Sequence, residues 1–473
     1  MKKMFTKLAG AALMISLISL SFNGNAQTTL ASAVTTDKGA SKAEPAKTTT
    51  EKAAAKAAED TTWKPQRRLW GYTFGDFYYD GHADATNRGG ETMYNGVPTG
   101  RNAFQFRRLY LGYDYEITKK FKAQVLLASE PNANTSVNGA TAIQNGDNLA
   151  DNKMAFWIKN FNLRTRDVWR GTDFVIGEMS TPGFALNEPG TNGPTSLSEA
   201  TWSYRSIEKT VTDFHKNNSY DVGAALQGTF DPSTKNFGYV LMVGNNSQAS
   251  LLGASNPNTG FFKMFYGDLW AKFFNQKLYI DIYADYLKTA NNSTVSNTIL
   301  SPATLAVGPQ EHNMFKVFVS YATRPVTFGF EAYTQKIANA VVNTGPVPAT
   351  NAAPTTVAAV EDATVTGISV WVRGPIAKNL NYFGRFDSYN PDTKYNAANQ
   401  YQIVNTNYGS YSPIAKEQFW TAGLDYNPTR NVHFEPNIWL VDYKDNRAST
   451  TAGTVAADHT LVYRFTFYYT FGK

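Results

Sequence analysis

Large apolar and aromatic residues occupy every second position along the last segment of the chain. An extended strand has a side-chain period of two, so this segment would have one apolar face and one mostly polar face. The apolar face consists of Leu461, Tyr463, Phe465, Phe467, Tyr469 and Phe471, and the other face contains Val462, Arg464, Thr466, Tyr468 and Thr470. A membrane-spanning β-barrel needs a last strand that closes the sheet and faces lipid. We therefore interpret Tyr463, Phe465, Phe467, Tyr469 and Phe471 as a barrel-assembly signal.

The chain from Arg67 onward consists of short alternating segments that are separated by two kinds of connection. Turn-like connections rich in Asn, Asp, Gly and Pro alternate with long polar connections. The short ones are 118–120, 166–171, 231–236, 275–277, 323–325, 374–379 and 427–431, and the long ones are 82–100, 131–151, 180–218, 246–260, 288–311, 337–363, 390–416 and 444–458. Bacterial barrels have short periplasmic turns and long extracellular loops. This pattern predicts an all-β fold, a transmembrane antiparallel β-barrel of about sixteen strands.

The two faces of the predicted strands differ in polarity. The residues expected to face lipid are Leu109, Leu111, Tyr113, Tyr115, Ile117, Leu278, Ile280, Ile282, Tyr286, Val326, Phe328, Phe330 and the apolar set of the last strand. The charged residues expected to face the lumen are Arg108, Asp114, Glu116, Lys122, Asp221, Asp281, Asp285, Lys316, Glu331, Arg385, Asp387, Glu435 and Arg464. A Lys or Arg facing lipid at mid-depth costs roughly 2 to 4 kcal/mol. Since about sixteen strands enclose an aqueous lumen, the interior is predicted to be a water-filled channel.

The N-terminus predicts secretion. Residues 1–26 contain three lysines, an apolar run at 8–20 and small residues at 24–26, which is the pattern of a signal peptide. Residues 27–62, rich in Ala, Thr, Lys and Glu, predict a low-complexity periplasmic arm, and residues 63–473 predict the barrel. The chain lacks cysteine and an internal apolar run of roughly twenty residues, which excludes disulfides and a helical membrane protein. Much of the net charge of +6 lies near the N-terminus, so it does not predict nucleic-acid binding.

The third long connection, 180–218, is among the longest and carries many charged and aromatic residues. In a barrel of this size a long third loop commonly folds inward and narrows the pore. We expect this loop to form the constriction, with Arg205, Glu208, Lys209 and Asp213 lining the pore. The alternative is an outward loop whose charges are solvated.

Several motifs carry a family resemblance. The run 106–112, FRRLYLG, resembles the early-strand RRxxxG-type pattern of the phosphate-selective porin O/P family, and 177–183, GEMSTPG, resembles that family's GQxxTPxG-type segment before its third loop. The similarity continues in order at 204–209, 220–223, 385–387 and 390–392. The resemblance implies a sixteen-stranded outer-membrane channel, often trimeric, and the chain is similar in general to porins of the Bacteroidota.

The expected function is passive diffusion of small hydrophilic solutes or ions. Selection of a multiply charged anion such as phosphate needs a ladder of Arg and Lys, whereas the predicted inner face mixes both signs. An anion-selective or phosphate-selective channel stays an alternative, as does a non-conducting barrel that serves as a surface-binding anchor. A sugar-preferring channel would use stacked inner-face aromatics, for which the candidates are Tyr110, Tyr279, Tyr283, Trp371, Trp439 and Tyr468. Aromatic girdles at the membrane surfaces are the other interpretation of those rings.

Catalysis is not predicted. The five histidines, His82, His215, His312, His433 and His459, show neither metal-ligand spacing nor pairing with an obvious serine nucleophile. The sequence also has no phosphate-binding GxxxxGKS loop and no GxSxG elbow. We therefore expect no catalytic residue, metal or organic cofactor. The expected location is the outer membrane of a Gram-negative cell, with lipid, small solutes or ions, the barrel-assembly machinery and a possible homotrimer as partners, and with no nucleic acid.

Overall fold

The computed structural model describes residues 63–84, 98–129, 156–185, 210–216, 219–245, 262–288, 293–296, 304–323, 325–346, 359–396, 398–403, 416–444 and 458–472. The predicted signal peptide, 1–26, and the predicted arm, 27–62, lie outside these ranges. Among the described residues, no helix has the length and the apolar character needed to cross a bilayer.

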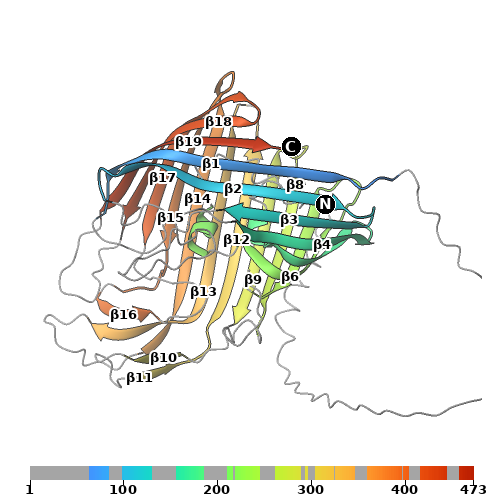
Figure 1. Ribbon diagram of the computed structural model, residues 1–473. Helices are drawn as coiled ribbons and strands as arrows, with labels where there is room; N and C mark the ends of the chain where they lie inside the picture. Colours follow the sequence, from blue (N-terminus) through green and yellow to red (C-terminus); the bar gives the residue numbers. More distant parts are fainter. Residues whose placement is uncertain are drawn as a thin grey trace, which may run out of the picture. The chain divides into compact units, whose positions relative to one another are not determined.

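Sixteen of the described strands form one closed antiparallel barrel, in which each strand pairs with its neighbours along the chain. The ring closes because β1 pairs with both β2 and β19 (Figure 1). The barrel strands are β1 (Arg67–His82), β2 (Asn102–Glu116), β3 (Phe121–Ser129), β4 (Trp157–Trp169), β5 (Thr172–Ser180), β6 (Tyr220–Thr229), β7 (Phe237–Gly244), β8 (Met264–Phe273), β9 (Leu278–Lys288), β12 (Glu311–Ala322), β13 (Thr327–Pro346), β14 (Ala359–Ala377), β15 (Leu380–Asn390), β17 (Glu417–Thr429), β18 (Val432–Tyr443) and β19 (His459–Phe471). The predicted fold class is thereby confirmed.

Short and long connections alternate around the barrel, as the sequence predicts. The short ones are tight, and β4 and β5 are joined by only two residues, as are β14 and β15. In the turn between β6 and β7, the carboxylate of Asp231 accepts hydrogen bonds from the backbone N–H groups of Asn236 and Phe237 at 2.8 and 2.9 Å, and from Thr234. Partial burial alone would raise the pKa of Asp231, but these hydrogen bonds hold it below the ordinary value.

The connection predicted at 337–363 is shorter than expected, because its flanking strands continue into it. The ladder between β13 and β14 extends to the pair Asn343 and Ala359, after a register shift between Ile337 and Val341. Asn339 lies within this shift and has a φ of 54°, which interrupts the regular alternation that a sequence pattern can detect. The connection 390–416 contains β16 (Asn399–Ile403), which pairs with the end of β13, and 288–311 contains the hairpin of β10 (Ser293–Ser296) and β11 (Thr304–Val307).

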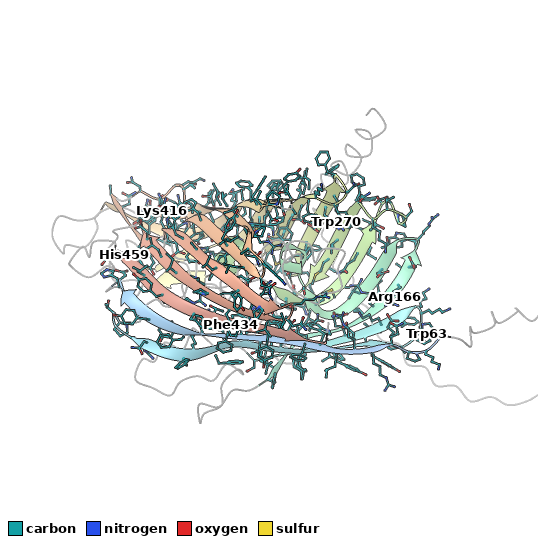
Figure 2. All side chains as sticks on the ribbon, turned by 90° about the horizontal axis from the view of Figure 1, so that it is seen from above. Trp63, Arg166, Trp270, Lys416, Phe434 and His459 are labelled. Carbon is teal, nitrogen blue, oxygen red and sulfur yellow. The ribbon has the colours of Figure 1, made fainter. Side chains whose placement is uncertain are left out.

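The two faces of the wall differ as the alternation predicts, and Figure 2 shows side chains standing on both faces of the strands. Along β19, Tyr463, Phe465, Phe467 and Tyr469 are 37 to 49% exposed, whereas the intervening Val462, Arg464, Thr466, Tyr468 and Thr470 are at most 8% exposed. An exposed aromatic face on a closed barrel requires an apolar environment, which a lipid bilayer supplies.

The seam between β1 and β19 is packed by rings over glycines. An ideal Cβ at Gly71 would lie 2.4 Å from Cζ of Phe471, and one at Gly75 would lie 2.7 Å from Cζ of Phe467. Both pairs are register partners across the seam. The aromatic rings of the last strand therefore cover the space that a side chain would occupy on the first strand.

A methyl group at Gly75 is expected to weaken the barrel. Gly75→Ala would place its Cβ 2.6 Å from the Gln105 carbonyl oxygen as well as against Phe467, so strand and ring must both shift. We expect a loss of about 1 to 3 kcal/mol of unfolding free energy, measured by denaturant titration in detergent. Gly267→Ala on β8 is the matched control, because no atom lies within 4 Å of its ideal Cβ. Equal stability of the two variants would contradict this packing account.

Candidate functional site

The candidate site is the inner face of the barrel together with the described ends of the third long connection. Thirteen charged residues were expected to face the lumen, and twelve of them are at most 8% exposed: Arg108, Asp114, Lys122, Asp221, Asp281, Asp285, Lys316, Glu331, Arg385, Asp387, Glu435 and Arg464. Each of these buried residues lies on the face of its strand opposite to the exposed apolar residues. The thirteenth, Glu116, is partly exposed. Their contacts fall into several groups.

One group lies at the seam, around Asp76 of β1. Oδ2 of Asp76 accepts a hydrogen bond from Nη1 of Arg107 at 3.3 Å and from Nε of Arg464 at 3.0 Å. All three side chains are fully buried. The Arg464 guanidinium also lies 4.2 Å from the ring centroid of Trp439, within cation–π range. This group joins three neighbouring strands, β19, β1 and β2, through one carboxylate.

Arg107 is the residue of this group that strict alternation assigns to the wrong face. Phe74 of β1 pairs with Arg108, but the next residue, Gly75, pairs with Phe106. Arg107 is thus the extra residue of a β-bulge, and both arginines are buried. The sequence could have indicated that Arg107 faces inward, because the free-energy cost of an arginine facing lipid is high.

A second group surrounds Asp114 on β2. Its carboxylate lies 3.4 Å from Nζ of Lys122 and 3.3 Å from Nη2 of Arg68, and it accepts a hydrogen bond from Nε2 of Gln124 at 3.2 Å. On β15, Arg385 and Asp387 form an ion pair through two hydrogen bonds from the guanidinium to the carboxylate. The charges around Asp114 and on β15 are therefore largely compensated by neighbours of opposite sign.

A third group, on β8 to β13, is mostly acidic. It combines the buried carboxylates of Asp268, Asp281 and Glu331 with one buried lysine, Lys316. Asp281 and Glu331 flank the same residue of β12, Phe318, in the ladders on either side. Nζ of Lys316 donates a hydrogen bond to the carbonyl oxygen of Gly183 at 2.6 Å, so this part of the wall holds the beginning of the third long connection.

The two described ends of the third connection lie against the inner wall. At its start, α2 (Pro182–Ala185) contacts β7, β8 and β9. At its end, α4 (Val211–Lys216) contacts β14, and Figure 1 draws this short helix in green among the strands. Thr212 donates two hydrogen bonds to Oε1 of Glu331, from its backbone N–H at 3.2 Å and from Oγ1 at 2.5 Å.

The side chains of α4 reach the wall formed by β15, β17 and β18. Phe214 packs 6.0 Å from both Phe419 and Trp439, measured between ring centroids. The His215 ring stacks on Tyr389 at 3.5 Å. Meanwhile Asp213 is 6% exposed and accepts a hydrogen bond from Ser219, which immediately precedes β6. Because β6 and β15 are far apart in the strand order, α4 bridges separate parts of the inner wall.

These contacts place one of the four predicted constriction residues, Asp213, inside the barrel. The other three, Arg205, Glu208 and Lys209, lie outside the described residues, so their pore-lining role stays a prediction. The residues that hold α4 and α2, Glu331 and Lys316, were expected only as lumen charges. Their anchoring role could not be found from local sequence, because each partner lies more than one hundred residues away.

The six inner-face aromatics are buried but not gathered in one stack. Tyr110 and Tyr468 share one cluster, and Tyr279 and Trp371 share another. The remaining two, Tyr283 and Trp439, belong to two further clusters. Within the described residues, these rings do not form one continuous row along a wall.

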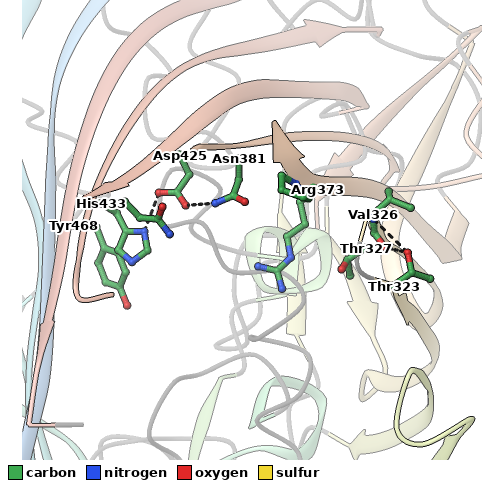
Figure 3. Close-up of a pocket in the computed structure, with 11 residues that line it drawn as sticks. Thr323, Val326, Thr327, Arg373, Asn381, Asp425, His433 and Tyr468 are labelled. Atoms are coloured by element: carbon green, nitrogen blue, oxygen red, sulfur yellow. Dashed lines mark hydrogen bonds and ion pairs between the residues drawn. The ribbon is translucent and has the colours of Figure 1, made fainter. Parts of the chain in front are cut away.

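A polar cavity of about 330 Å³ opens at the end of the barrel that carries the short turns (Figure 3). Its lining includes Arg373, Asn381, Asp425 and His433. Oδ1 of Asp425 lies 2.8 Å from Nδ1 of His433, and its Oδ2 accepts a hydrogen bond from Asn381 at 3.2 Å. The cavity is a polar recess beside the lumen, on the predicted periplasmic side.

No protein-family model and no curated protein matches the sequence. Among solved structures, the chain is similar to the outer membrane channel DcaP of Acinetobacter baumannii, with 10% identity over 86% of this chain and 97% of that chain and a TM-score of 0.52. It also matches the anion-selective porin from Comamonas acidovorans, with 10% identity over 86% and 100% of the two chains and a TM-score of 0.48. At this identity the likeness to DcaP shows a shared barrel fold and nothing finer.

Removal of the Glu331 carboxylate is expected to release α4. Glu331→Ala deletes the acceptor of both Thr212 hydrogen bonds, and such charge-assisted bonds contribute about 1.5 to 3 kcal/mol. Hydrogen exchange at residues 210–216 should therefore accelerate roughly ten- to hundred-fold, as measured by mass spectrometry on the folded barrel. Asp114→Ala is the control, since its ion pairs lie on β1 to β3. Unchanged exchange in Glu331→Ala would show that α4 is held by other contacts.

Proposed function

We propose that this chain is an outer-membrane porin, a channel through which small hydrophilic solutes or ions diffuse passively. The observation that carries the proposal is a closed sixteen-strand wall that is apolar outside and charged inside, with α4 docked across its interior. A barrel of this strand number is wide enough for an aqueous lumen. In this proposal the strands enclose the channel, and the third connection narrows it.

The third loop is the proposed constriction. Hydrogen bonds from Thr212 to Glu331 and from Lys316 to Gly183 support this role, because they tie both described ends of the loop to the inner wall. We propose that Arg205, Glu208, Lys209 and Asp213 contribute to the narrow part of the pore. Solutes would then be selected by size and by the field of fixed charges at that level.

We propose a modest preference for cations. Among the buried residues of the described ranges, sixteen are Asp or Glu and seven are Lys or Arg. A fixed negative excess raises the local concentration of cations and lowers that of anions. Anion or phosphate selectivity is the second candidate, which the resemblance to the phosphate-selective porin O/P family suggests and the paired inward arginines, Arg107 and Arg108, favour.

The remaining parts of the proposal follow from the barrel. Its exposed aromatic belt fits the lipid of a Gram-negative outer membrane, and the last strand would be recognised by the barrel-assembly machinery. A homotrimer is proposed from the family resemblance. We propose no catalytic activity and no organic cofactor. A non-conducting barrel that acts as a surface-binding anchor is the rival function.

Purified protein should form channels in a planar lipid bilayer. We expect stepwise conductance increases in KCl, because each inserted barrel opens an aqueous path. Glu331→Ala should increase the single-channel conductance relative to the wild type and to Asp114→Ala, since a released α4 no longer narrows the lumen. If well-folded, heat-modifiable protein produces no conductance steps, the anchor function is favoured over the channel.

The ion preference can be measured separately in a salt gradient. With KCl at tenfold different concentrations, the reversal potential should have the sign of K⁺ preference. Asp285→Asn should move that potential toward Cl⁻, because it removes negative charge from the inner wall. A wild-type potential of the Cl⁻ sign would instead support the anion-selective alternative.

A further inference from the structure

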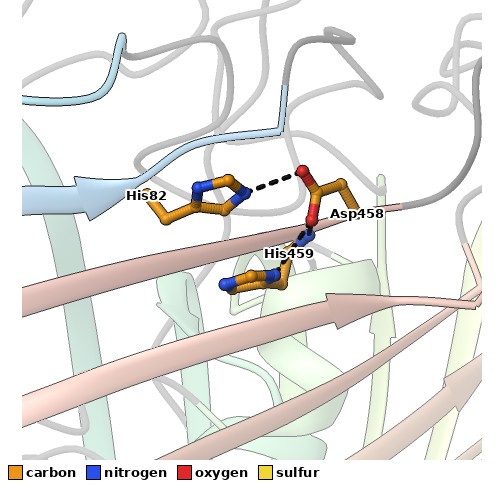
Figure 4. Close-up of side chains that lie close together, drawn as sticks. All are labelled: His82, Asp458 and His459. Carbon is orange, nitrogen blue, oxygen red and sulfur yellow. Dashed lines mark hydrogen bonds and ion pairs between the residues drawn. The ribbon is translucent and has the colours of Figure 1, made fainter.

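The far ends of the first and last strands bring two histidines and an aspartate together. His82 ends β1, whereas Asp458 and His459 lie at the start of β19, on the end of the barrel that carries the long connections (Figure 4). One ligand atom from each of the three side chains lies within 4.8 Å of the others. The cluster is separate from the inner-wall groups and from the cavity at the other end.

The aspartate bridges the two imidazoles. Nε2 of His82 lies 2.7 Å from Oδ2 of Asp458, and Nδ1 of His459 lies 2.9 Å from Oδ1 of the same carboxylate. The two rings stack at 4.2 Å between centroids. Both imidazoles therefore turn a ring nitrogen toward one carboxylate, which is the donor arrangement of a two-histidine, one-carboxylate metal site.

The backbone explains how His82 joins the others. Asp80 pairs with Val462, but His82 pairs with Leu461, so β1 has one extra residue, Gly81, at this point. Leu461 belongs to the outward series of β19, and the bulge turns His82 to that same side. The three side chains are 39 to 43% exposed, which leaves room for water molecules to complete a coordination shell.

We propose that His82, Asp458 and His459 bind a late first-row divalent metal ion such as Zn²⁺ at the outer rim of the seam. Zinc takes imidazole nitrogen and carboxylate oxygen at about 2.0 to 2.2 Å, and water fills an open fourth position. On binding, each imidazole loses the proton that it donates to the carboxylate, so that the neutral ring carries its proton on the nitrogen that does not face the metal. The carboxylate exchanges its two hydrogen bonds for a bond to the ion.

Such an ion would join residues that are 376 positions apart in the chain. It would bond the end of β1 to the start of β19, across the pairing that closes the barrel between its first and last strands. An ion that binds only the folded barrel stabilises it by mass action. The proposed role of the ion is therefore to stabilise the pairing of the first and last strands at the cell surface.

The test is Zn²⁺ titration of the full-length protein, purified without a histidine tag in detergent, followed by isothermal calorimetry. We expect one site, with affinity lowered at least about tenfold in His82→Ala, His459→Ala and Asp458→Asn, because loss even of a supporting partner costs ten- to a hundredfold. His312→Ala is the matched control, since its Nε2 faces the amide oxygen of Gln310 rather than a carboxylate. Heat modifiability on gels establishes that each variant is folded.

A second cluster that could hold a metal ion consists of Asp425, His433 and Glu435. The variants distinguish binding at this cluster from binding at the proposed site. His433→Ala should leave the measured affinity unchanged. If Zn²⁺ binding is lost in His433→Ala and kept in His82→Ala, the ion belongs to the second cluster and the proposal is wrong. Absence of wild-type binding up to millimolar Zn²⁺ would overturn it too. As a structural readout, Zn²⁺ should raise the thermal unfolding temperature of the wild type and leave that of His459→Ala unchanged.

Discussion

The structure depends on the closure of one hydrogen-bonded sheet in an environment without water. An unpaired strand edge in hydrocarbon leaves each backbone polar group unsatisfied at a cost of several kcal/mol. Only the pairing of β1 with β19 removes the last edge, and it runs without interruption from Gly71 and Phe471 to Asp80 and Val462. The seam is accordingly well packed, with rings of β19 over glycines of β1 and with Asp76 held between Arg107 and Arg464. Each of the other barrel strands pairs with the barrel strands before and after it in the chain.

Closure also fixes what the inner wall can do. Lipid excludes charges from the outer face, so they gather inside, where they compensate one another or hold the third connection. Lys316 binds the Gly183 carbonyl and Glu331 binds Thr212, so inward-facing charged residues anchor the two described ends of the third connection to the wall. The proposed constriction therefore depends on charged residues of the wall. A change in one of these charges should alter both the electric field in the pore and the position of α4.

The sequence predicted what depends on local periodicity. The alternation of apolar and polar residues gave the faces of strands such as β19, and the alternation of short and long connections gave the strand number and topology. It did not reveal the continuation of β13 and β14 beyond Ile337, because Asn339 interrupts the alternation there. Nor did it reveal the partners of α4. Those contacts join residues more than one hundred positions apart, and a one-dimensional pattern carries no information about which strands meet across a lumen.

Bulges explain two places where function-bearing side chains depart from strict alternation. At Arg107, an extra residue on β2 directs a second arginine into the wall, where Asp76 compensates it. At Gly81, an extra residue on β1 directs His82 to the side of His459. Without that bulge, the parity of β1 would point position 82 into the lumen, and the two imidazoles would stand on opposite faces of the seam. A single inserted residue thus decides whether the histidines of the first and last strands can share one ligand.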